Sequence, residues 1–304
     1  MSISVIVCTR NRSEDLRRYL CSLDKQTQMP DELIIVDASE DEETRDFVER
    51  RMRMSQYVIK HVRCEPGLTK QRNRGIKESK GKYLFFFDDD VVLDPEYLQV
   101  SYETFDHFEG KNIGGVTGRI TNISKNRSAL DALFKKIYFL TEHGKGRLKK
   151  SGLPEHRSDD KLAFVEVFSG CSMAYKREVF SKYLFDERLT DYSYMEDVDF
   201  SYRVSRKYKL IYQPEAKLVH LSTTYKSVDS RFLRRMMVRN HCYLFRKNLP
   251  KDVPHIFGFA MSIVGLLLYN GVLMKDIKAC IGVIEGILRP LKVIERPDMM
   301  GKRS

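Results

Sequence analysis

Three short and nearly continuous apolar runs near the N-terminus restrict the fold more than any other feature of this sequence. They cover residues 3–8, 33–36 and 83–87, and they are rich in β-branched or aromatic side chains. Such runs are typical of parallel strands that are covered on both faces. Charged, helix-favouring stretches separate them, at about residues 13–25, 41–54 and 69–79. This alternation predicts right-handed βαβ crossovers and an α/β fold with a mainly parallel central sheet flanked by helices.

Each of the three runs ends in polar residues. Thr9, Arg10 and Asn11 follow the first run, Asp37 follows the second, and Asp88, Asp89 and Asp90 follow the third. In open α/β sheets, ligands bind beyond the carboxyl ends of the strands. Three polar strand ends at one edge of the sheet therefore predict a binding site there.

The acidic triplet is a candidate metal site. Alternation along a strand places Asp88 and Asp90 on one side and Asp89 on the other. Clustered carboxylates repel one another unless a cation lies among them, and Mg²⁺ and Mn²⁺ prefer oxygen ligands. His220, which ends a short strand expected at 216–220, is a further candidate ligand beside Asp90. The alternatives are a solvated acidic turn and a structural histidine.

Two other groups of residues lie at the starts of expected helices. Glu196 and Asp197 begin a helix at about 194–207. They are either a general base for an acceptor hydroxyl or acidic residues placed there by the helix dipole. Arg72 and Asn73 lie where an N-terminus and a guanidinium suit diphosphate or nucleobase contacts. The alternative for this pair is a solvated basic helix face.

The middle of the chain is less regular. Residues 113–120 and 164–168 are expected strands, and the second is followed by the small residues 170–172. Residues 122–161 are polar, basic and interrupted by glycine and proline. We interpret this stretch as an insertion or mobile loop.

The charge indicates anionic partners and the C-terminal region indicates a membrane. The formal net charge is +11 and the pI is near 9.2, which suits nucleotide phosphates, nucleic acid or an acidic membrane surface. A basic helix is expected at 228–248, and the following residues 256–274 carry no charge. Three interpretations of residues 256–274 remain open: a monotopic interfacial hairpin, a single membrane span, and a helix that covers the soluble core. The basic helix favours anionic headgroups and the cytoplasmic face.

The expected organisation is a catalytic domain followed by a helical appendage. Residues 1–225 would form the catalytic domain, with a nucleotide-binding half at 1–120 and an acceptor half at 121–225. Residues 226–304 would form the basic and apolar helical region. The six cysteines are scattered, without paired spacing, which is typical of reduced thiols in a cytosolic compartment.

Five spaced segments of this sequence resemble family 2 glycosyltransferases of the GT-A fold. These segments are residues 5–11 (VIVCTRN), 34–37 (IIVD), 71–75 (QRNRG), 87–90 (FDDD) and 196–200 (EDVDF). The resemblance covers residues 3 to about 248 and depends on the order and spacing of all five. One departure is Gln71, which stands where the family usually has a small residue before the arginine.

The resemblance implies a role for each candidate site residue. The implied nucleotide-binding residues are Thr9, Arg10, Asn11, Asp37, Arg72, Asn73, Asp88 and Asp89. Within this set, Thr9, Arg10 and Asp37 would line the nucleoside pocket, and Arg72 and Asn73 would close over the nucleotide. The implied metal ligands for Mn²⁺ or Mg²⁺ are Asp88, Asp90 and His220. Asp197 would be the catalytic base, supported by Glu196.

The function implied is that of a metal-dependent, inverting glycosyltransferase, hexosyl or related. It would move a sugar from a nucleotide-diphosphate donor to a glycan or lipid-linked saccharide acceptor, in glycan biosynthesis for the cell envelope. It would work at the cytoplasmic face of the membrane, with its C-terminal helices on the anionic surface.

Three alternatives come from other classes of protein. A sugar nucleotidyltransferase would need a glycine-rich phosphate loop after the first strand, and residues 9–12 contain no glycine. A nucleic-acid-binding module would carry aromatic residues interleaved with basic ones on strands. Because that pattern is missing, we expect no nucleic-acid partner. A non-catalytic nucleotide-binding scaffold would not need Asp88, Asp90 and Asp197.

Overall fold

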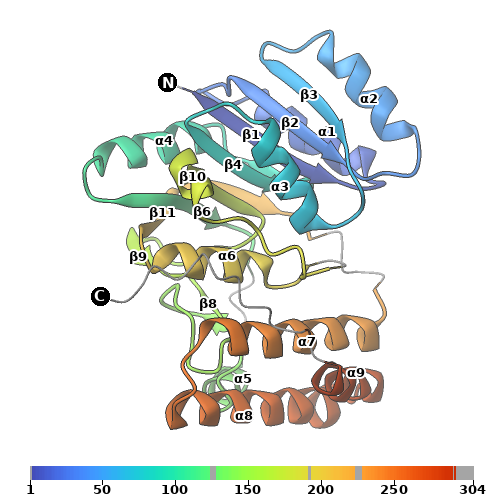
Figure 1. Ribbon diagram of the computed structural model, residues 1–304, viewed down its shortest axis with the longest axis vertical. Coiled ribbons are helices and arrows are strands. Elements are labelled where there is room, and N and C mark those ends of the chain that lie inside the picture. The colour runs from blue at the N-terminus through green and yellow to red at the C-terminus, as the bar shows by residue number, and fades with distance from the viewer. Residues whose placement is uncertain (1, 124–127, 191–192, 223–227, 290, 292–304) are drawn as a thin grey trace.

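A central mixed sheet organises the protein (Figure 1). The computed structural model describes residues 2–123, 128–190, 193–222, 228–289 and 291. The sheet contains β1 (Ile3–Thr9), β2 (Glu32–Asp37), β3 (Val58–Arg63), β4 (Tyr83–Asp88), β5 (Val91–Leu93), β6 (Ile113–Ile120), β9 (Ala163–Val165), β10 (Ser172–Lys176) and β11 (Lys209–His220). Its order is β3-β2-β1-β4-β10-β6-β11-β5, with β9 paired to β11.

The helices of the first two thirds of the chain are α1 (Ser13–Leu23), α2 (Glu43–Met52), α3 (Leu68–Glu78), α4 (Tyr97–His107), α5 (Ala129–Ile137), η1 (Arg177–Ser181) and α6 (Glu196–Ser205). A small second sheet pairs β7 (Glu142–His143) with β8 (Glu155–His156). The C-terminal helices are α7 (Ser230–Asn248), α8 (Val253–Leu268), the π-helical turn η2 (Tyr269–Leu273) and α9 (Ile277–Leu288).

The three apolar runs form the parallel core of the sheet, as expected. β1 lies between β2 and β4 and pairs with both in parallel. Because side chains alternate along a strand, Val5 enters the core on one face and Ile6 the core on the other. This two-sided burial explains why the runs are almost continuously apolar, and it confirms the predicted α/β fold.

Five strands were missing from the sequence-based prediction: β3, β5, β7, β8 and β10. β3 is half-polar because it is an edge strand, which in the described part of the chain pairs with β2 on one side only. β10 begins at Ser172, within the small residues that suggested a loop, and pairs antiparallel with β4 and β6. β11 is also longer than the predicted strand at 216–220, because its pairing with β6 resumes after a register shift between Tyr212 and Lys217.

Residues 122–161 contain more regular structure than predicted. They carry α5 and the two strands of the small sheet, although residues 124–127 lie outside the described part of the chain. Leu140 and Leu153 are buried in a core that also includes Val198 of α6 and Tyr243 of α7. The insertion is therefore anchored to the helices that follow the sheet.

The C-terminal helices pack closely against one another. Gly282 and Gly286 of α9 face the backbone of α7, so a Cβ there would lie 2.3 and 2.7 Å from the carbonyl oxygens of Arg231 and Arg235. The segment Val253–Leu273 is long and apolar enough to cross a membrane by length and composition. The expected domain boundary at 225/226, like residues 292–304, lies outside the described residues, so the division into domains stays a prediction.

The packing of α3 on the sheet gives a first testable prediction. A methyl group at Gly75 would lie 2.4 Å from Ile6 Cγ2, whereas Gly to Ala in an open helix is favourable by up to about 1 kcal/mol. We expect Gly75→Ala to lower the free energy of unfolding by about 1–3 kcal/mol through overpacking, measured by urea denaturation. Arg74→Ala, at the exposed neighbouring position, is the control. A raised denaturation midpoint for Gly75→Ala would contradict the close contact.

Candidate active site

The polar strand ends open into one cavity of about 1040 Å³. Its walls come from the ends of β1, β4 and β11 and from the starts of α3, α6 and α7. The lining residues used below are Thr9, Arg10, Asn11, Arg12, Gln71, Arg72, Asp88, Asp89, Pro154, His156, Gly170, Tyr194, Glu196, Asp197, His220 and Phe232. The ends of the first and third predicted strands thus meet at one cavity, as expected, whereas Asp37 at the end of the second does not line it. Lining residues as far apart in the chain as Cys8 and Phe232 meet there.

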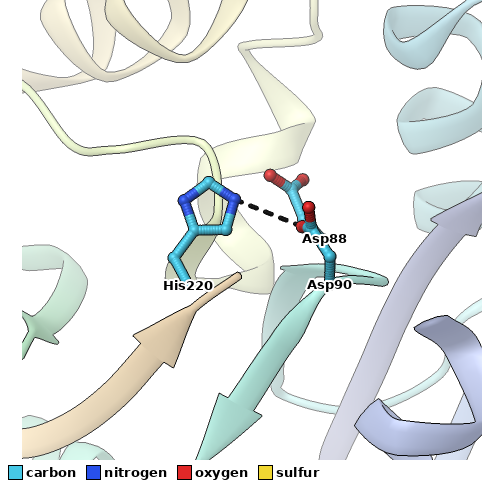
Figure 2. A group of neighbouring side chains, drawn as sticks. All are labelled: Asp88, Asp90 and His220. Atoms are coloured by element: carbon cyan, nitrogen blue, oxygen red, sulfur yellow. Dashed lines mark ion pairs between the residues drawn. The ribbon is translucent and has the colours of Figure 1, made fainter. Parts of the chain in front are cut away.

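Asp88, Asp90 and His220 form a compact group (Figure 2). One potential ligand atom from each lies within 4.8 Å of the others, and His220 Nε2 is 3.2 Å from Asp90 Oδ1. The antiparallel pairing of β5 with β11 sets His220 opposite Val91, next to the acidic triplet. Two carboxylates and an imidazole are a donor set suited to a divalent cation such as Mn²⁺ or Mg²⁺.

The charges of this group are mutually dependent. Burial raises the pKa of Asp88, although Arg72 and His220 oppose that rise. Burial disfavours the protonated form of His220, but the hydrogen bond to Asp90 and the charge of Asp88 outweigh it and raise the His220 pKa. The neighbouring carboxylates therefore favour the positively charged form of the imidazole.

Asp89 points to different partners from its two neighbours. It accepts hydrogen bonds from Thr9 Oγ1 at 2.8 Å and from Arg12 Nη1 at 2.5 Å. Arg12 also reaches Asp90 Oδ2 at 3.0 Å. Burial raises the pKa of Asp89 to about 7, against the charge of Arg12. The sequence analysis did not single out Arg12, which ties the end of β1 to the acidic triplet.

Arg72 joins two carboxylates and a backbone carbonyl of the site. It is 2% exposed and pairs with Glu196 of α6, and its Nη2 lies 3.2 Å from Asp88 Oδ1 and 2.8 Å from Gly170 O. Burial opposes its charge, but Glu196 and Asp88 outweigh burial and raise the pKa of Arg72. Burial raises the pKa of Glu196 to about 8, with Asp197 adding to the rise and Arg72 opposing it.

Asp197 is fixed at the cavity wall by backbone donors. Its Oδ2 accepts from Gly170 N at 2.6 Å and its Oδ1 accepts from Val198 N at 2.8 Å. A Cβ at position 170 would come within 3.2 Å of this carboxylate, so a glycine allows the close approach. The adjacent Glu196 points instead to Arg72, and the two acidic residues therefore occupy different environments.

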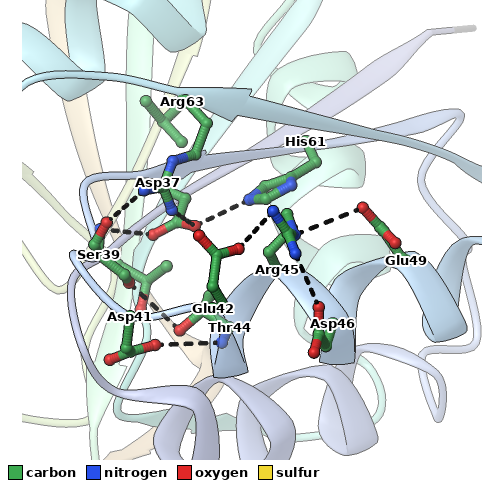
Figure 3. Close-up of polar contacts among 12 residues, drawn as sticks. Asp37, Ser39, Asp41, Glu42, Thr44, Arg45, Asp46, Glu49, His61 and Arg63 are labelled. Carbon is green, nitrogen blue, oxygen red and sulfur yellow. Dashed lines mark hydrogen bonds and ion pairs between the residues drawn. The ribbon is translucent and has the colours of Figure 1, made fainter.

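Asp37 does not line the cavity, and Figure 3 shows the polar contacts that it makes instead. It is fully buried; its Oδ2 contacts His61 Nε2 at 2.9 Å and Arg63 Nη1 at 3.0 Å, and its Oδ1 accepts from Ser39 N. Burial raises the pKa of Asp37, but these hydrogen bonds prevail and lower it to about 2. In this arrangement Asp37 holds the chain after β2. Its contact with a nucleoside stays a prediction, and a nucleoside would have to replace some of these hydrogen-bond partners.

Asn73 also faces away from the cavity. Its side-chain amide donates to Phe185 O at 3.0 Å and to Glu187 Oε1 at 2.8 Å, and its oxygen accepts from Phe185 N. Arg10 and Asn11 do line the cavity, and both contact Glu40. Among the residues expected to bind the nucleotide, Asp37 and Asn73 thus do not line the cavity. Their side chains take part in hydrogen-bond networks beside it.

Two lining residues had no clear pattern in the sequence. His156 and Pro154 reach the cavity from the insertion at 122–161, whose polar composition resembled that of a surface loop. The structure gives a reason for Gln71, which stands where the family usually has a small residue. Its side-chain amide donates to Thr9 O at 3.1 Å and to Val36 O at 2.9 Å. It therefore joins the ends of β1 and β2, which a small residue would not do.

A mainly parallel sheet flanked by helices, with polar residues at its carboxyl edge, is the architecture of the GT-A fold. The family model for glycosyl transferase family 2 matches residues 4–184, and the chain belongs to this family. Poly(ribitol-phosphate) β-N-acetylglucosaminyltransferase TarP of Staphylococcus aureus is 25% identical over 238 residues, covering 76% of this chain and 68% of TarP. An uncharacterised glycosyltransferase of Haemophilus influenzae is 37% identical over 94 residues, or 31% of each chain.

Solved structures share the fold at low sequence identity. The mannosyltransferase PcManGT of Pyrobaculum calidifontis, solved with GDP-Man and Mn²⁺, has a TM-score of 0.59 at 14% identity, covering 94% of this chain and 86% of that one. Residues 1–349 of S. aureus TarS give 0.53 at 18% identity, covering 95% and 91%. These similarities confirm the GT-A-like fold that the sequence motifs implied.

The burial of Arg72 gives a second prediction. Removing the guanidinium leaves Glu196 and Asp88 without their compensating charge, because both carboxylates contact it. We expect Arg72→Met to lower the free energy of unfolding by about 3–5 kcal/mol, measured by chemical denaturation. Arg74→Met makes the same change at an exposed position of the same helix and should cost less than about 1 kcal/mol. Equal effects of the two substitutions would contradict the central position of Arg72.

Proposed function

We propose that this protein is a metal-dependent, inverting glycosyltransferase that uses a nucleoside diphosphate sugar. The observation that carries the proposal is the meeting of two groups at one cavity, the Asp88, Asp90 and His220 group and the Asp197 carboxylate. The first group is suited to a cation that binds a diphosphate, and the second to removal of a proton from an acceptor. The family membership supports the transfer of a sugar.

The donor is proposed from the same edge of the sheet. Asp88, Asp90 and His220 would hold Mn²⁺ or Mg²⁺, and Thr9, Arg10 and Asn11 would contact the nucleotide. A cation bound there offsets the negative charge that develops on the leaving diphosphate. The mannosyltransferase neighbour was solved with GDP-Man and Mn²⁺ and the TarS neighbour with UDP, which supports a nucleotide-sugar donor.

In the proposed reaction, Asp197 accepts the proton of the acceptor hydroxyl. The acceptor oxygen forms a bond to the anomeric carbon from the face opposite the diphosphate. The bond from that carbon to the phosphate oxygen breaks, and the nucleoside diphosphate leaves with the electron pair. One displacement inverts the configuration and requires no enzyme nucleophile. The backbone N–H groups of Gly170 and Val198 orient Asp197. Arg72 is a positioning residue, because it holds Glu196, the neighbour of Asp197 in the sequence.

The acceptor is proposed to be a glycan or lipid-linked saccharide of the cell envelope. His156, Pro154 and Phe232 line the cavity from segments other than the strand ends, and we assign the acceptor to these residues. The basic and apolar C-terminal helices suit an anionic membrane at its cytoplasmic face. A sugar nucleotidyltransferase would release pyrophosphate in place of a nucleoside diphosphate, so a product assay separates that alternative. A non-catalytic scaffold would give neither product.

Metal-dependent nucleotide binding is the first test. UDP, GDP and dTDP are added with Mn²⁺, with Mg²⁺ or with EDTA, and the melting temperature is followed. We expect one nucleotide to raise the melting temperature with metal and not with EDTA, because a ligand of the native state stabilises it. Asp90→Asn should lose this shift, whereas Asp106→Asn, at an exposed position on α4, should keep it. Absence of any shift with the wild-type protein would contradict the proposed donor site.

Asp197→Asn separates catalysis from donor binding. We expect turnover to fall by about 10²–10⁴-fold, because the amide does not accept the acceptor proton, while the metal-dependent shift in melting temperature is retained. Turnover is measured as release of nucleoside diphosphate, and the anomeric configuration of the product by NMR. The control is Asp160→Asn at an exposed position of the insertion. Unchanged turnover in Asp197→Asn would remove this residue from the mechanism, and retention of configuration would exclude direct displacement.

A further inference from the structure

α5 turns its apolar side chains away from the protein. Leu130, Leu133 and Ile137 share one face of this helix and are 78%, 54% and 51% exposed. None of the residues of α5 is buried. The half-buried residues of α5 are Asp131, Phe134 and Lys135, on the side next to this face, and the Phe134 ring lies 6.0 Å from that of Tyr269. A water-exposed surface helix has the reverse orientation, with apolar residues toward the core.

The two helices beside α5 show the same reversal. On the side of α8 that meets the body, small residues such as Gly258, Ser262 and Gly265 are buried. Its large exposed residues, with those of η2 and α9, are Ile256, Phe257, Val264, Val272, Leu273, Met274, Ile277, Ile281, Ile284 and Leu288. Together with Leu130, Leu133 and Ile137 we call these residues the outer apolar surface. The three helices lie together at the end of the molecule away from β1–β3 (Figure 1), and such a surface marks an interaction site.

The charges around this surface are predominantly positive. In α7–α9 the acidic residues are already engaged within the protein. Asp229, Asp252 and Asp276 cap the N-termini of the three helices, and Glu285 pairs with Arg231. Lys136, Lys275 and Lys278 are exposed beside the apolar residues. Positive side chains next to exposed apolar ones fit an anionic lipid surface, whereas a second copy of the same surface would bring like charges together.

We propose that the outer apolar surface, α5 included, lies flat in the headgroup region of an anionic membrane. Flat contact follows from the packing of α8, because a Cβ at Gly265 would lie 2.3 Å from Tyr138 and one at Gly258 3.2 Å from Ser151 N. These contacts hold α8 against the insertion along its length, so it does not leave the body to span the bilayer. The inference rests on the proposed function for its membrane and adds α5 and the orientation.

This placement brings the cavity close to membrane-bound acceptors. The insertion that carries α5 continues to His156 at the cavity wall, and α7, which packs on α9, places Phe232 there. The chain therefore connects the outer apolar surface to the proposed acceptor side through two short paths. An acceptor saccharide anchored in the same membrane by a lipid would be presented to Asp197 from that side.

The test is a vesicle-binding experiment with the full chain. Cosedimentation is measured with vesicles of phosphatidylcholine alone and of phosphatidylcholine with phosphatidylglycerol. We expect the wild type to bind the anionic vesicles more tightly. The variant Leu130→Ser, Leu133→Ser, Ile137→Ser should bind them at least tenfold more weakly. The control variant Met54→Ser, Val58→Ser, Leu184→Ser changes exposed apolar residues outside this surface and should bind as the wild type does.

Each further outcome decides the inference. Equal vesicle binding by the two triple variants would overturn the assignment of α5. The wild type could instead be a dimer in buffer and the α5 variant a monomer, with equal vesicle binding by both. That result would assign the surface to contact with a second copy of the chain. The metal-dependent nucleotide shift should be the same in wild type and both variants. Its presence without vesicle binding would overturn this inference and leave the donor site intact, and its absence from the wild type would count against the proposed function.

Discussion

The buried guanidinium of Arg72 is the interaction on which the arrangement of the active site depends. Taking an arginine out of water costs several kcal/mol unless carboxylates and further hydrogen bonds compensate it. Here the compensation comes from Glu196, Asp88 and Gly170 O, which belong to α6, to β4 and to the segment between β9 and β10. Satisfying one side chain therefore fixes α6 against the parallel sheet, and Asp197, next to Glu196, is placed at the cavity as a result.

Repulsion between carboxylates imposes a second constraint. Asp88, Asp89 and Asp90 are consecutive, and the last two are each 2% exposed. Arg12 reduces the repulsion by contacting both Asp89 and Asp90, while His220 is left facing Asp88 and Asp90. Arg12 thus supplies a positive charge on one side of the triplet, and the carboxylates favour the charged form of His220 on the other. A divalent cation among Asp88, Asp90 and His220 would offset the charge of the two carboxylates directly.

Local patterns predicted the part of the fold that local burial determines. The strands β1, β2 and β4 are buried on both faces, so their sequences are apolar throughout and were recognised. β3 and β10 owe their strand structure to pairing partners, and their own sequences are half-polar or begin with small residues. The same holds for the site: the strand ends predicted that Thr9 and Asp88 would meet, and the family resemblance added His220 to Asp88 and Asp90. The networks of Asp37 and Asn73 depend on His61, Arg63 and Phe185. The exposed apolar face of α5 was not predicted either, because it depends on how the helix packs and the surrounding sequence is polar and basic.

The chain divides its chemistry between segments with different constraints. The matched family region, 4–184, includes the strand ends that surround the acidic triplet and the insertion with α5 and His156. The catalytic Asp197 proposed here, His220 and α7–α9 follow that region, and they complete the cavity and form most of the outer apolar surface. A change in α7 or in the insertion therefore alters both the acceptor wall and the seating of the helices. Under the proposals made above, acceptor choice and membrane contact would be coupled through these two segments, while nucleotide binding at the sheet edge would be free to remain unchanged.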